Sequence, residues 1–521
     1  MCSPKTLYVI LSHSAISHPR YKYALPLRGA YGSVRKCVSS TNFRMEVYYM
    51  SSSSKAGERI TSLLDDNSFV EIGARITART TDFNQKPDKT PSDGVITGYG
   101  VINGSLVYVY SQDASVLGGS VGEAHARKIV DLYDLAMKTG APVIGLIDSA
   151  GFRLQEGTDA LNAFGEIYAA QAAASGVIPQ ITAVFGSCGG GLALLPALTD
   201  FTFMADDAKL FVNSPNALPK NSEDKNDTAS AASKAASGNV DFTGTEEEVI
   251  AGIRQLIDLL PSNNEDTTYA DCEDDLNRAS ENVAAGYKDP SVAVADVADD
   301  GLFVEAGKDC APEMAVGFIR MNGATVGVVA NREVKFDEEG KTAAEYGTKL
   351  TTAGLYKAAK FVNFCDAFGL PVVTFTNTDG FKADAASENT IADAAGKLAY
   401  AFANADVAKV NVITGSAVGS AYNVMNSKAL GADVTIALPD AKVGIMDADK
   451  AAKVLAADKS AEEAAEIKKE YAELQDSIDS AARHGYIDEI VEPADLRKYL
   501  ISALEILYTK EAYYDKKHGT V

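Results

Sequence analysis

The chain has 521 residues, of which 46% are hydrophobic and 23% charged, and its formal net charge is -23. The first 44 residues hold seven Lys and Arg and no acidic residue, so the remainder carries about -30. Such a surface repels phosphate backbones and anionic lipid, and we therefore expect no nucleic-acid partner. The length predicts two domains. The sequence has no run of 18 apolar residues, so we expect no membrane span.

Residues 1–44 are basic and rich in Ser, and the globular pattern begins at Lys55. We interpret them as an N-terminal extension outside the fold, with an organellar transit peptide as the alternative. The six Cys and five His are scattered and give no metal-ligand spacing, so we expect free thiols, no metal and no Ser-His-Asp triad. A reducing compartment follows, and we expect the cytoplasm rather than the mitochondrial matrix.

One series of elements is written twice along the chain. Each copy opens on a hairpin, with turns at Asn103-Gly104 and Asn322-Gly323. A helical segment follows at 126–140 or 355–369, and each ends at a Gly before a Pro. Two buried-strand segments with a helix between them come next, at 141–152 and 179–194 in one copy and at 370–381 and 408–425 in the other. The fixed order predicts an α/β fold made of two duplicated domains.

The segments outside the duplicated series are predicted from composition. The stretch 220–244 predicts a loop, and the acidic stretch 263–300 predicts the linker between the domains. Residues 461–485 predict one charged helix ending at Gly485, followed by a short strand and a final helix that begins at a Pro.

Each copy contains small residues where its last strand must turn into a helix. The first copy has Gly186-Ser187-Cys188-Gly189-Gly190-Gly191, and the second has Val418-Gly419-Ser420-Ala421-Tyr422. N–H groups at a helix start are unpaired donors that can stabilise an enolate oxygen. Close packing or phosphate binding is the alternative for either cluster alone, and the matched positions favour the oxyanion role. Neither cluster fits a P-loop or a dinucleotide motif.

Two further segments leave alternatives open. In the loop 148–157, Arg153 and Glu156 form either a weak ion pair at a helix end or part of a turn that shapes a ligand pocket. After Leu117-Gly118-Gly119-Ser120, a helix carries His125, Arg127 and Lys128, which either contact phosphates or form a solvated face. Tyr422 and Phe381 are interpreted as core or pocket-wall aromatics.

From about Lys55 to its C-terminus the chain resembles the carboxyltransferase subunits of propionyl-CoA and acetyl-CoA carboxylases, methylmalonyl-CoA decarboxylase and transcarboxylase. Segments that carry the resemblance include LGGSVGEAHARKI, GAPVIGLIDSAGFRLQEG, ASGVIPQITAVFGSCGGG, AGLYKAAKFVNFCDAFGLPVVTF and ARHGYIDEIVEPADLRKYLISALEIL.

The resemblance implies two tandem crotonase-like domains, with 45–285 on the acyl-CoA side and 286–521 on the biotin side. It implies a hexamer, a trimer of dimers, with active sites between subunits. The implied partners are a biotin carboxyl carrier protein and either a biotin carboxylase subunit or a membrane decarboxylase subunit. The implied reaction moves a carboxyl group between carrier-bound biotin and the α-carbon of propionyl-, methylmalonyl-, acetyl- or malonyl-CoA.

The resemblance also implies roles for single residues. The catalytic oxyanion holes are the N–H groups of Gly190, Gly191, Ser420 and Ala421. The residues implied to bind acyl-CoA or biotin are Gly118, Gly119, Ala150, Gly151, Phe152, Arg153, Gly380, Phe381, Gly419 and Asn423. The chain departs from the family pattern on the biotin side, at Ser420, Asp379 and Asp393. Two other hypotheses stay open: an enoyl-CoA hydratase or isomerase with Glu156 as its base, and a scaffold without activity.

Overall fold

The structure is a computed structural model that describes residues 54–80, 90–267, 269–475 and 477–510. The predicted extension 1–44 lies outside the described residues. The first helix, α1 (Lys55–Leu63), is capped by Ser54, whose side chain accepts the Gly57 N–H at 3.3 Å. A helix therefore begins at Lys55, where the globular pattern of the sequence begins. In the described part of the chain no helix is long and apolar enough to cross a membrane.

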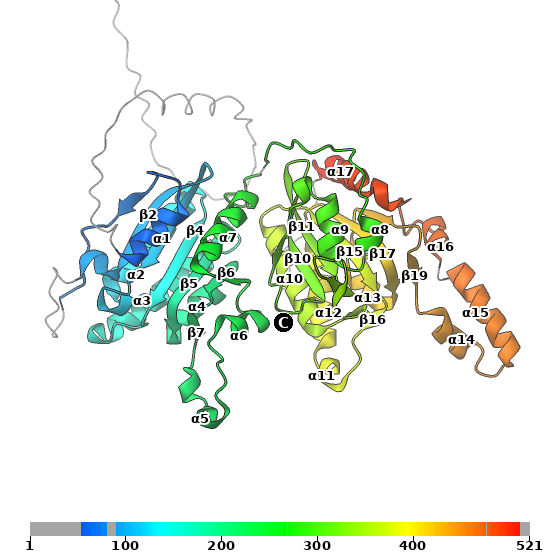
Figure 1. The fold of residues 1–521 in the computed structure, drawn as a ribbon, viewed down its shortest axis with the longest axis horizontal. Coiled ribbons are helices and arrows are strands. Elements are labelled where there is room, and N and C mark those ends of the chain that lie inside the picture. The colour runs from blue at the N-terminus through cyan, green and yellow to red at the C-terminus, as the bar shows by residue number, and fades with distance from the viewer. Residues whose placement is uncertain (1–53, 81–89, 268, 476, 511–521) are drawn as a thin grey trace, which may run out of the picture. The chain divides into compact units, whose positions relative to one another are not determined.

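The first half of the chain forms one eight-stranded sheet (Figure 1). The strand order is β1-β2-β3-β4-β5-β6-β8, and β7 pairs with β5. Strands β3 to β6 are parallel, and their side chains are almost all buried, as expected for a parallel sheet covered on both faces. The bounds are β1 (Val70–Ile72), β2 (Val95–Ile102), β3 (Ser105–Gln112), β4 (Val143–Ser149), β5 (Gln180–Gly189), β6 (Phe201–Ala205), β7 (Lys209–Phe211) and β8 (Phe242–Gly244).

The second half repeats this topology. Its sheet has the order β20-β18-β17-β15-β11-β10-β9, and β19 pairs with β17 as β7 pairs with β5. The duplication read from the sequence is therefore present strand by strand. The bounds are β9 (Val304–Ala306), β10 (Met314–Met321), β11 (Ala324–Asn331), β15 (Val372–Thr378), β17 (Lys409–Val418), β18 (Val434–Ala437), β19 (Lys442–Gly444) and β20 (Glu489–Ile490). Two short ladders pair β12 (Val334–Phe336) with β13 (Thr342–Glu345) and β14 (Lys349–Leu350) with β16 (Gly380–Phe381).

Both predicted hairpins form at their Asn-Gly turns. Asn103 and Gly104 have φ of 49° and 87°, and Asn322 and Gly323 have φ of 51° and 76°. Two consecutive residues with positive φ join antiparallel strands without splaying them. The turns fix the registers of the pairs β2–β3 and β10–β11.

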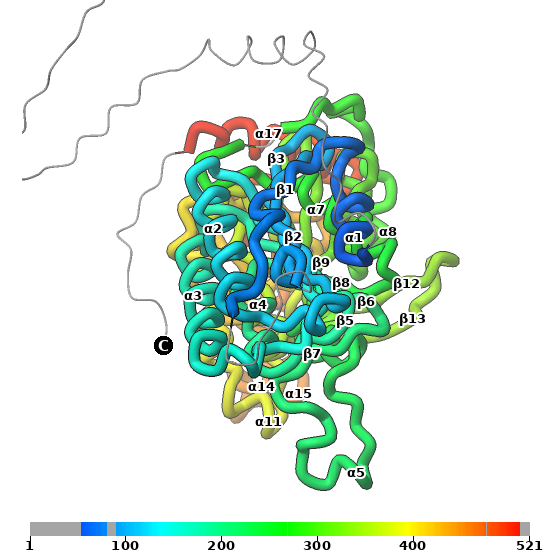
Figure 2. Tube along the Cα trace, turned by 90° about the vertical axis from the view of Figure 1, so that its left-hand side faces the viewer, coloured from blue at the N-terminus to red at the C-terminus, as the bar shows by residue number. Residues whose placement is uncertain are grey.

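Helices cover the sheets in the same way in both halves. Figure 2 shows α2 (Glu123–Thr139) and α3 (Thr158–Ala174) on one side of the first sheet, and α1 and α7 (Glu246–Leu259) on the other. In the second half, α10 (Thr352–Ala367) packs on α12 (Ile391–Asn404) as α2 packs on α3. The remaining helices are α4 (Leu194–Ala197), α5 (Asn221–Asp224), α6 (Ala231–Ala236), α8 (Val283–Gly286), α9 (Pro290–Val297), α11 (Ala385–Glu388), α13 (Gly419–Val424), α14 (Ala448–Leu455), α15 (Ala461–Gln475), α16 (Ile478–Arg483) and α17 (Leu496–Leu507).

Three of the composition-based predictions are wrong in detail. The predicted loop 220–244 contains α5, α6 and a strand of the main sheet, β8. The predicted linker 263–300 contains α8 and α9, the latter capped by the Asp289 side chain and begun by Pro290. The single C-terminal helix is two helices, because the Ser477 side chain starts α16 by accepting the Ser480 N–H.

Candidate active site

The first candidate oxyanion hole lies where β5 ends. A short 3₁₀ helix, Gly190–Ala193, follows Gly189 directly and leads into α4. Gly190 has φ of 63°, a conformation that a side chain would strain. No side chain caps this start, and N–H groups in a first helical turn have no acceptor within the helix. The turn can therefore present the Gly190 and Gly191 N–H groups to an anion.

The neighbouring loops leave little room around this turn. The Tyr168 hydroxyl donates to the Gly191 carbonyl at 2.6 Å. A Cβ on Gly191 would lie 3.0 Å from the Phe152 ring and 3.0 Å from that hydroxyl. A Cβ on Gly151 would lie 3.5 Å from the Gly189 carbonyl oxygen. The structure thus places Gly151 and Phe152 beside the first glycine turn.

The turn 117–119 docks onto the same loop. The Ala150 N–H donates to the Gly118 carbonyl, and the Val121 N–H to the Gly151 carbonyl, both at 2.8 Å. Gly119 has φ of 64°, and a Cβ there would collide with the Asp148 carbonyl. Five of the predicted binding residues, Gly118, Gly119, Ala150, Gly151 and Phe152, are therefore brought together with Gly190 and Gly191.

The second candidate hole has the same construction. Strand β17 ends at Val418, and α13 begins at Gly419, whose φ is 62°. This helix start also has no side-chain cap. Ser420 and Asn423 are exposed one helical turn apart, whereas the Ala421 side chain is 1% exposed. Gly419, Ser420 and Asn423 therefore share one accessible helix start.

The second loop mirrors the first as well. The pairing of Leu350 with Phe381 repeats the bridge between Val121 and Phe152. Gly380 and Phe381 thus occupy the positions of Gly151 and Phe152, 229 residues further on. The same shift pairs Gly190 with Gly419 and Gly191 with Ser420. The predicted donor pair of the second half, Ser420-Ala421, therefore lies one residue beyond the positions that match the first predicted pair, Gly190-Gly191. The choice of donor pairs stays a prediction.

An ion pair marks the second site and has no counterpart in the first. Lys349 Nζ lies 3.0 Å from Asp379 Oδ1, while the corresponding residues in the first half are Ser120 and Ala150. Burial raises the pKa of Asp379, but hydrogen bonds from Lys349 and Thr348 outweigh it and hold that pKa below its ordinary value. The biotin-side departure at Asp379 is therefore a charged pair at the edge of the second hole.

Arg153 is the centre of a buried cluster. Its Nη1 lies 2.9 Å from Glu156 Oε1 and 2.5 Å from Asp93 Oδ1, and its Nη2 donates to the Ser120 carbonyl at 2.6 Å. The side chains of all three charged residues are 0% exposed. Arg153 and Glu156 thus form the ion pair considered for them, but it is part of a buried cluster and not a weak, solvated pair. The cluster joins the loops 90–94, 117–121 and 150–157, which positions the turn that carries Gly151 and Phe152.

Glu156 is unsuited to the alternative role of a hydratase base. Besides Arg153, it accepts the Glu123 N–H at 2.7 Å. One oxygen of this buried carboxylate contacts the Arg153 guanidinium and the other accepts a helix-start N–H, so neither is free to act on a substrate.

The helix α2 does not present the solvated basic face considered for it. His125 is fully buried, and Lys128 is 3% exposed, with its ammonium donating to the Ser92 hydroxyl at 2.7 Å and to the Ser92 and Val95 carbonyls. Burial lowers the pKa of Lys128 to about 8. Of the three residues considered, only Arg127 is exposed, and it pairs with Glu123 at 2.8 Å. His125 and Lys128 support the fold and do not reach a bound phosphate.

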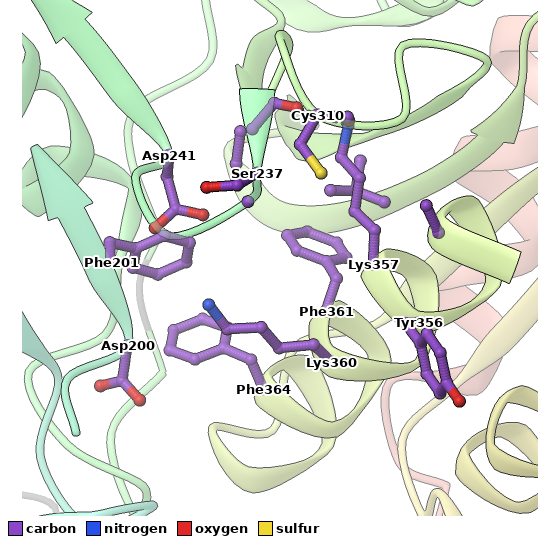
Figure 3. A pocket seen from close by; sticks show the side chains of 15 residues that line it. Asp200, Phe201, Ser237, Asp241, Cys310, Tyr356, Lys357, Lys360, Phe361 and Phe364 are labelled. Carbon is purple, nitrogen blue, oxygen red and sulfur yellow. Dashed lines mark hydrogen bonds between the residues drawn. The ribbon is translucent and has the colours of Figure 1, made fainter. Parts of the chain in front are cut away.

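Within the described residues no three His, Cys, Asp or Glu side chains are grouped so as to hold a metal ion. Cys188, Cys272, Cys310 and Cys365 are free thiols, as predicted, and Cys2 and Cys37 lie outside the described residues. A cavity elsewhere in the chain, lined by residues such as Phe201 and Lys360, contains none of the predicted site residues (Figure 3).

Comparisons with known proteins show the family to which the chain belongs. The family model described as "Carboxyl transferase domain" matches residues 50–521. The propionyl-CoA carboxylase beta chain of Saccharopolyspora erythraea is 38% identical over 500 residues, covering 89% of this chain and 90% of the relative. The methylmalonyl-CoA decarboxylase subunit alpha of Veillonella parvula is 37% identical over 495 residues, covering 92% and 95%.

A solved structure has the same fold as this chain. The transcarboxylase 12S hexamer, with methylmalonyl-coenzyme A and methylmalonic acid bound, superposes with a TM-score of 0.81 at 33% identity. The superposition covers 89% of this chain and 91% of that one. The α/β, crotonase-like fold predicted from the sequence is confirmed.

The family match and these relatives define the chain as a biotin-dependent carboxyltransferase. The chain belongs to the carboxyl transferase domain family.

Proposed function

We propose that this enzyme transfers a carboxyl group between biotin on a carrier protein and the α-carbon of a short acyl-CoA, with propionyl-CoA and methylmalonyl-CoA as its pair of thioesters. The two relatives and the bound structure named above share this one carbon skeleton. The observation that supports the reaction is the pair of uncapped helix starts after β5 and β17, each of which begins at a glycine with positive φ.

In the first half, the N–H groups of Gly190 and Gly191 would hold the thioester oxygen. Removing the α-proton, or losing the carboxyl group, turns this oxygen into an enolate oxygen that carries negative charge. Backbone donors that are already in place stabilise that charge without reorganising. The loop of Gly118, Gly119, Ala150, Gly151 and Phe152 would bind the acyl-CoA, and buried Arg153 would keep it in place.

In the second half, the N–H groups of Ser420 and Ala421 would hold the ureido oxygen of biotin, with Gly380, Phe381, Gly419 and Asn423 around the ring. The residues present fit this group, because the helix start is uncapped and its outer face at Ser420 and Asn423 is open. When bound, biotin supplies the nitrogen on which the carboxyl group travels. The side chains of Asp379 and Lys349 would border this site and tune its charge.

The proposal extends to the assembly. We place acyl-CoA on residues 45–285 and biotin on residues 286–521, in a hexamer whose active sites lie between subunits. Its partners would be a biotin carboxyl carrier protein and a biotin carboxylase or membrane decarboxylase subunit. The described free thiols are compatible with a reducing compartment, and we assign the enzyme to the cytoplasm.

The test uses the purified full chain with methylmalonyl-CoA, in the presence and absence of free biotin. We expect propionyl-CoA to form at a rate that depends on biotin. Hydration of crotonyl-CoA, independent of biotin, would point to the hydratase hypothesis instead. A hexamer that turns over none of these thioesters, even with a biotinylated carrier domain, would favour the scaffold.

A further inference from the structure

A cavity of about 310 Å³ lies where the first sheet meets α10 of the second half (Figure 3). Its lining comes from the start of β6, the segments 237–241 and 306–310, and one face of α10. The volume is that of a small-molecule site. The cavity shares no residue with the predicted acyl-CoA and biotin sites, so the carboxyl transfer does not account for it.

Aromatic rings form the apolar wall of the cavity. The rings of Phe201 and Phe364 meet edge to face with centroids 4.9 Å apart. Phe318, behind the wall, contacts Phe201 at 5.8 Å and Phe361 at 5.0 Å. Interlocked rings of this kind form a rigid surface, against which an aromatic or branched apolar group would pack well.

Two lysines from successive turns of α10 bring positive charge to the cavity. Lys357 is fixed, because its ammonium donates to the carbonyls of Gly307 and Cys310 at 2.8 and 3.0 Å. Lys360 has no ion-pair partner among the residues that the structure describes. Figure 3 shows its side chain extending from α10 toward Asp200 and Phe201.

The two carboxylates of the cavity accept hydrogen bonds from the backbone and interact with Lys360 only through its charge. One oxygen of Asp200 accepts the Gln180 N–H, and one of Asp241 accepts the Thr202 N–H, both at 2.8 Å. Burial raises the pKa of Asp200 to about 7, so this carboxyl carries only part of a charge at neutral pH. The charge of Lys360 partly offsets the rise in the pKa of both carboxyls, but among the described residues no carboxylate lies within ion-pair distance of its ammonium. Lys360 is therefore the cation of the cavity that is open to a bound anion.

We propose that this cavity is a second ligand site, which binds a small monoanion with an aromatic or branched apolar body. The anionic group pairs with Lys360, and the body packs on Phe201, Phe361 and Phe364. The site is separate from the carboxyl-transfer site and does not depend on the function proposed above.

The probe is 8-anilinonaphthalene-1-sulfonate, an aromatic monoanion whose fluorescence rises in apolar surroundings. With the assembled full-length protein we expect saturable binding of one probe per chain, and excess methylmalonyl-CoA should leave it bound. Lys360→Glu should weaken binding about tenfold or more, which is about 1.4 kcal/mol or more. The matched control is Lys335→Glu, the same charge reversal at an exposed lysine outside the cavity, and it should change the Kd less than twofold.

A second pair of measurements does not depend on charge. Ala353→Trp places a large side chain from the exposed start of α10 into the cavity and should abolish the saturable signal. Bound probe should slow the alkylation of Cys310, which lines the cavity, by N-ethylmaleimide, and should leave that of Cys272 unchanged. The proposal is overturned by displacement of the probe with methylmalonyl-CoA, by equal affinity in the wild type and both cavity variants, by a Cys310 that is unreactive or unprotected, or by the absence of saturable binding.

Discussion

Asp148 and Asn377 occupy the same place in the two halves of the chain. Each lies at the point where the ladder to the next strand shifts register, β4–β5 in one case and β15–β17 in the other. Each side chain fills the space over a glycine of that next strand, Gly186 or Gly415. The strands that lead to the two glycine turns are thus packed in the same way near their ends. A polar side chain lies over a glycine of the next strand, and it is a carboxylate in one half and an amide in the other.

The contact between Asp148 and Gly186 predicts that Gly186→Ala is destabilising. The new Cβ would overlap Asp148 Oδ1, whose carboxylate is tied to Arg59 at 3.1 Å. We expect a loss of about 1–3 kcal/mol in the free energy of unfolding, measured by urea titration. Adding Asp148→Ala should recover part of the loss, because it removes the obstruction.

The control for that substitution is Gly165→Ala in α3, where a Cβ meets nothing within 4 Å. There alanine should stabilise the helix by about 0.5–1 kcal/mol. Equal effects of the two substitutions, or strictly additive effects of Gly186→Ala and Asp148→Ala, would contradict the packing described.

Replacing Arg153 is expected to lower the stability of the chain strongly, because this residue is the cation of a buried cluster. Arg153→Met leaves two buried carboxylates, Asp93 and Glu156, without their cation, which should cost about 3–5 kcal/mol. Arg127→Met removes an exposed arginine from α2 and should cost less than about 1 kcal/mol. Chemical denaturation of both variants measures the difference. A similar small cost for both would show that the Arg153 cluster does not hold the loop.

Lys128 predicts a pH dependence of stability. Its pKa is about 8 in the folded chain, against 10.5 for an ordinary lysine, so between these pH values unfolding takes up a proton. The free energy of unfolding therefore rises with pH over this window, and the penalty is complete below it. Lys128→Met should remove a rise of about 3 kcal/mol. Denaturation of the variant and the wild type from pH 7.5 to 10.5 is the measurement.

The same substitution at Lys138, which is exposed on the same helix, is the control. Lys138→Met should keep the wild-type pH profile. If Lys128→Met also keeps that profile, Lys128 is not titrating in a buried site.

The duplicated elements could be predicted because their signals are local. An Asn-Gly pair between alternating residues, or a Gly before a Pro after a helical period, determines the chain's path within a few residues. The helix α2 ends as predicted at Gly140, whose φ is 63°. The glycine turns at Gly190 and Gly419 were found for the same reason.

Burial of charged side chains could not be predicted in this way. The pattern of α2 does not reveal that Lys128 points inward, because its partners at Ser92 and Val95 come from a loop and a strand more than 30 residues away. Arg153 is similar, since Asp93 lies 60 positions earlier. The cavity between the first sheet and α10 depends on how two distant segments pack. The ion pair of Asp379 with Lys349 depends on a short ladder that no periodicity indicates.

The central claim is that backbone N–H groups after β5 and β17 carry the catalysis, and a pair of substitutions at one position tests it most directly. Ser420→Ala keeps the predicted N–H donor of the exposed residue, whereas Ser420→Pro removes it in a first helical turn, where proline is tolerated. The measurement is kcat for biotin-dependent conversion of methylmalonyl-CoA to propionyl-CoA, with thermal unfolding as a check on the fold. The account predicts a rate within about threefold of the wild type for Ser420→Ala and a loss of about 10²–10³ for Ser420→Pro. Equal rates in a folded Ser420→Pro variant and the wild type would contradict it.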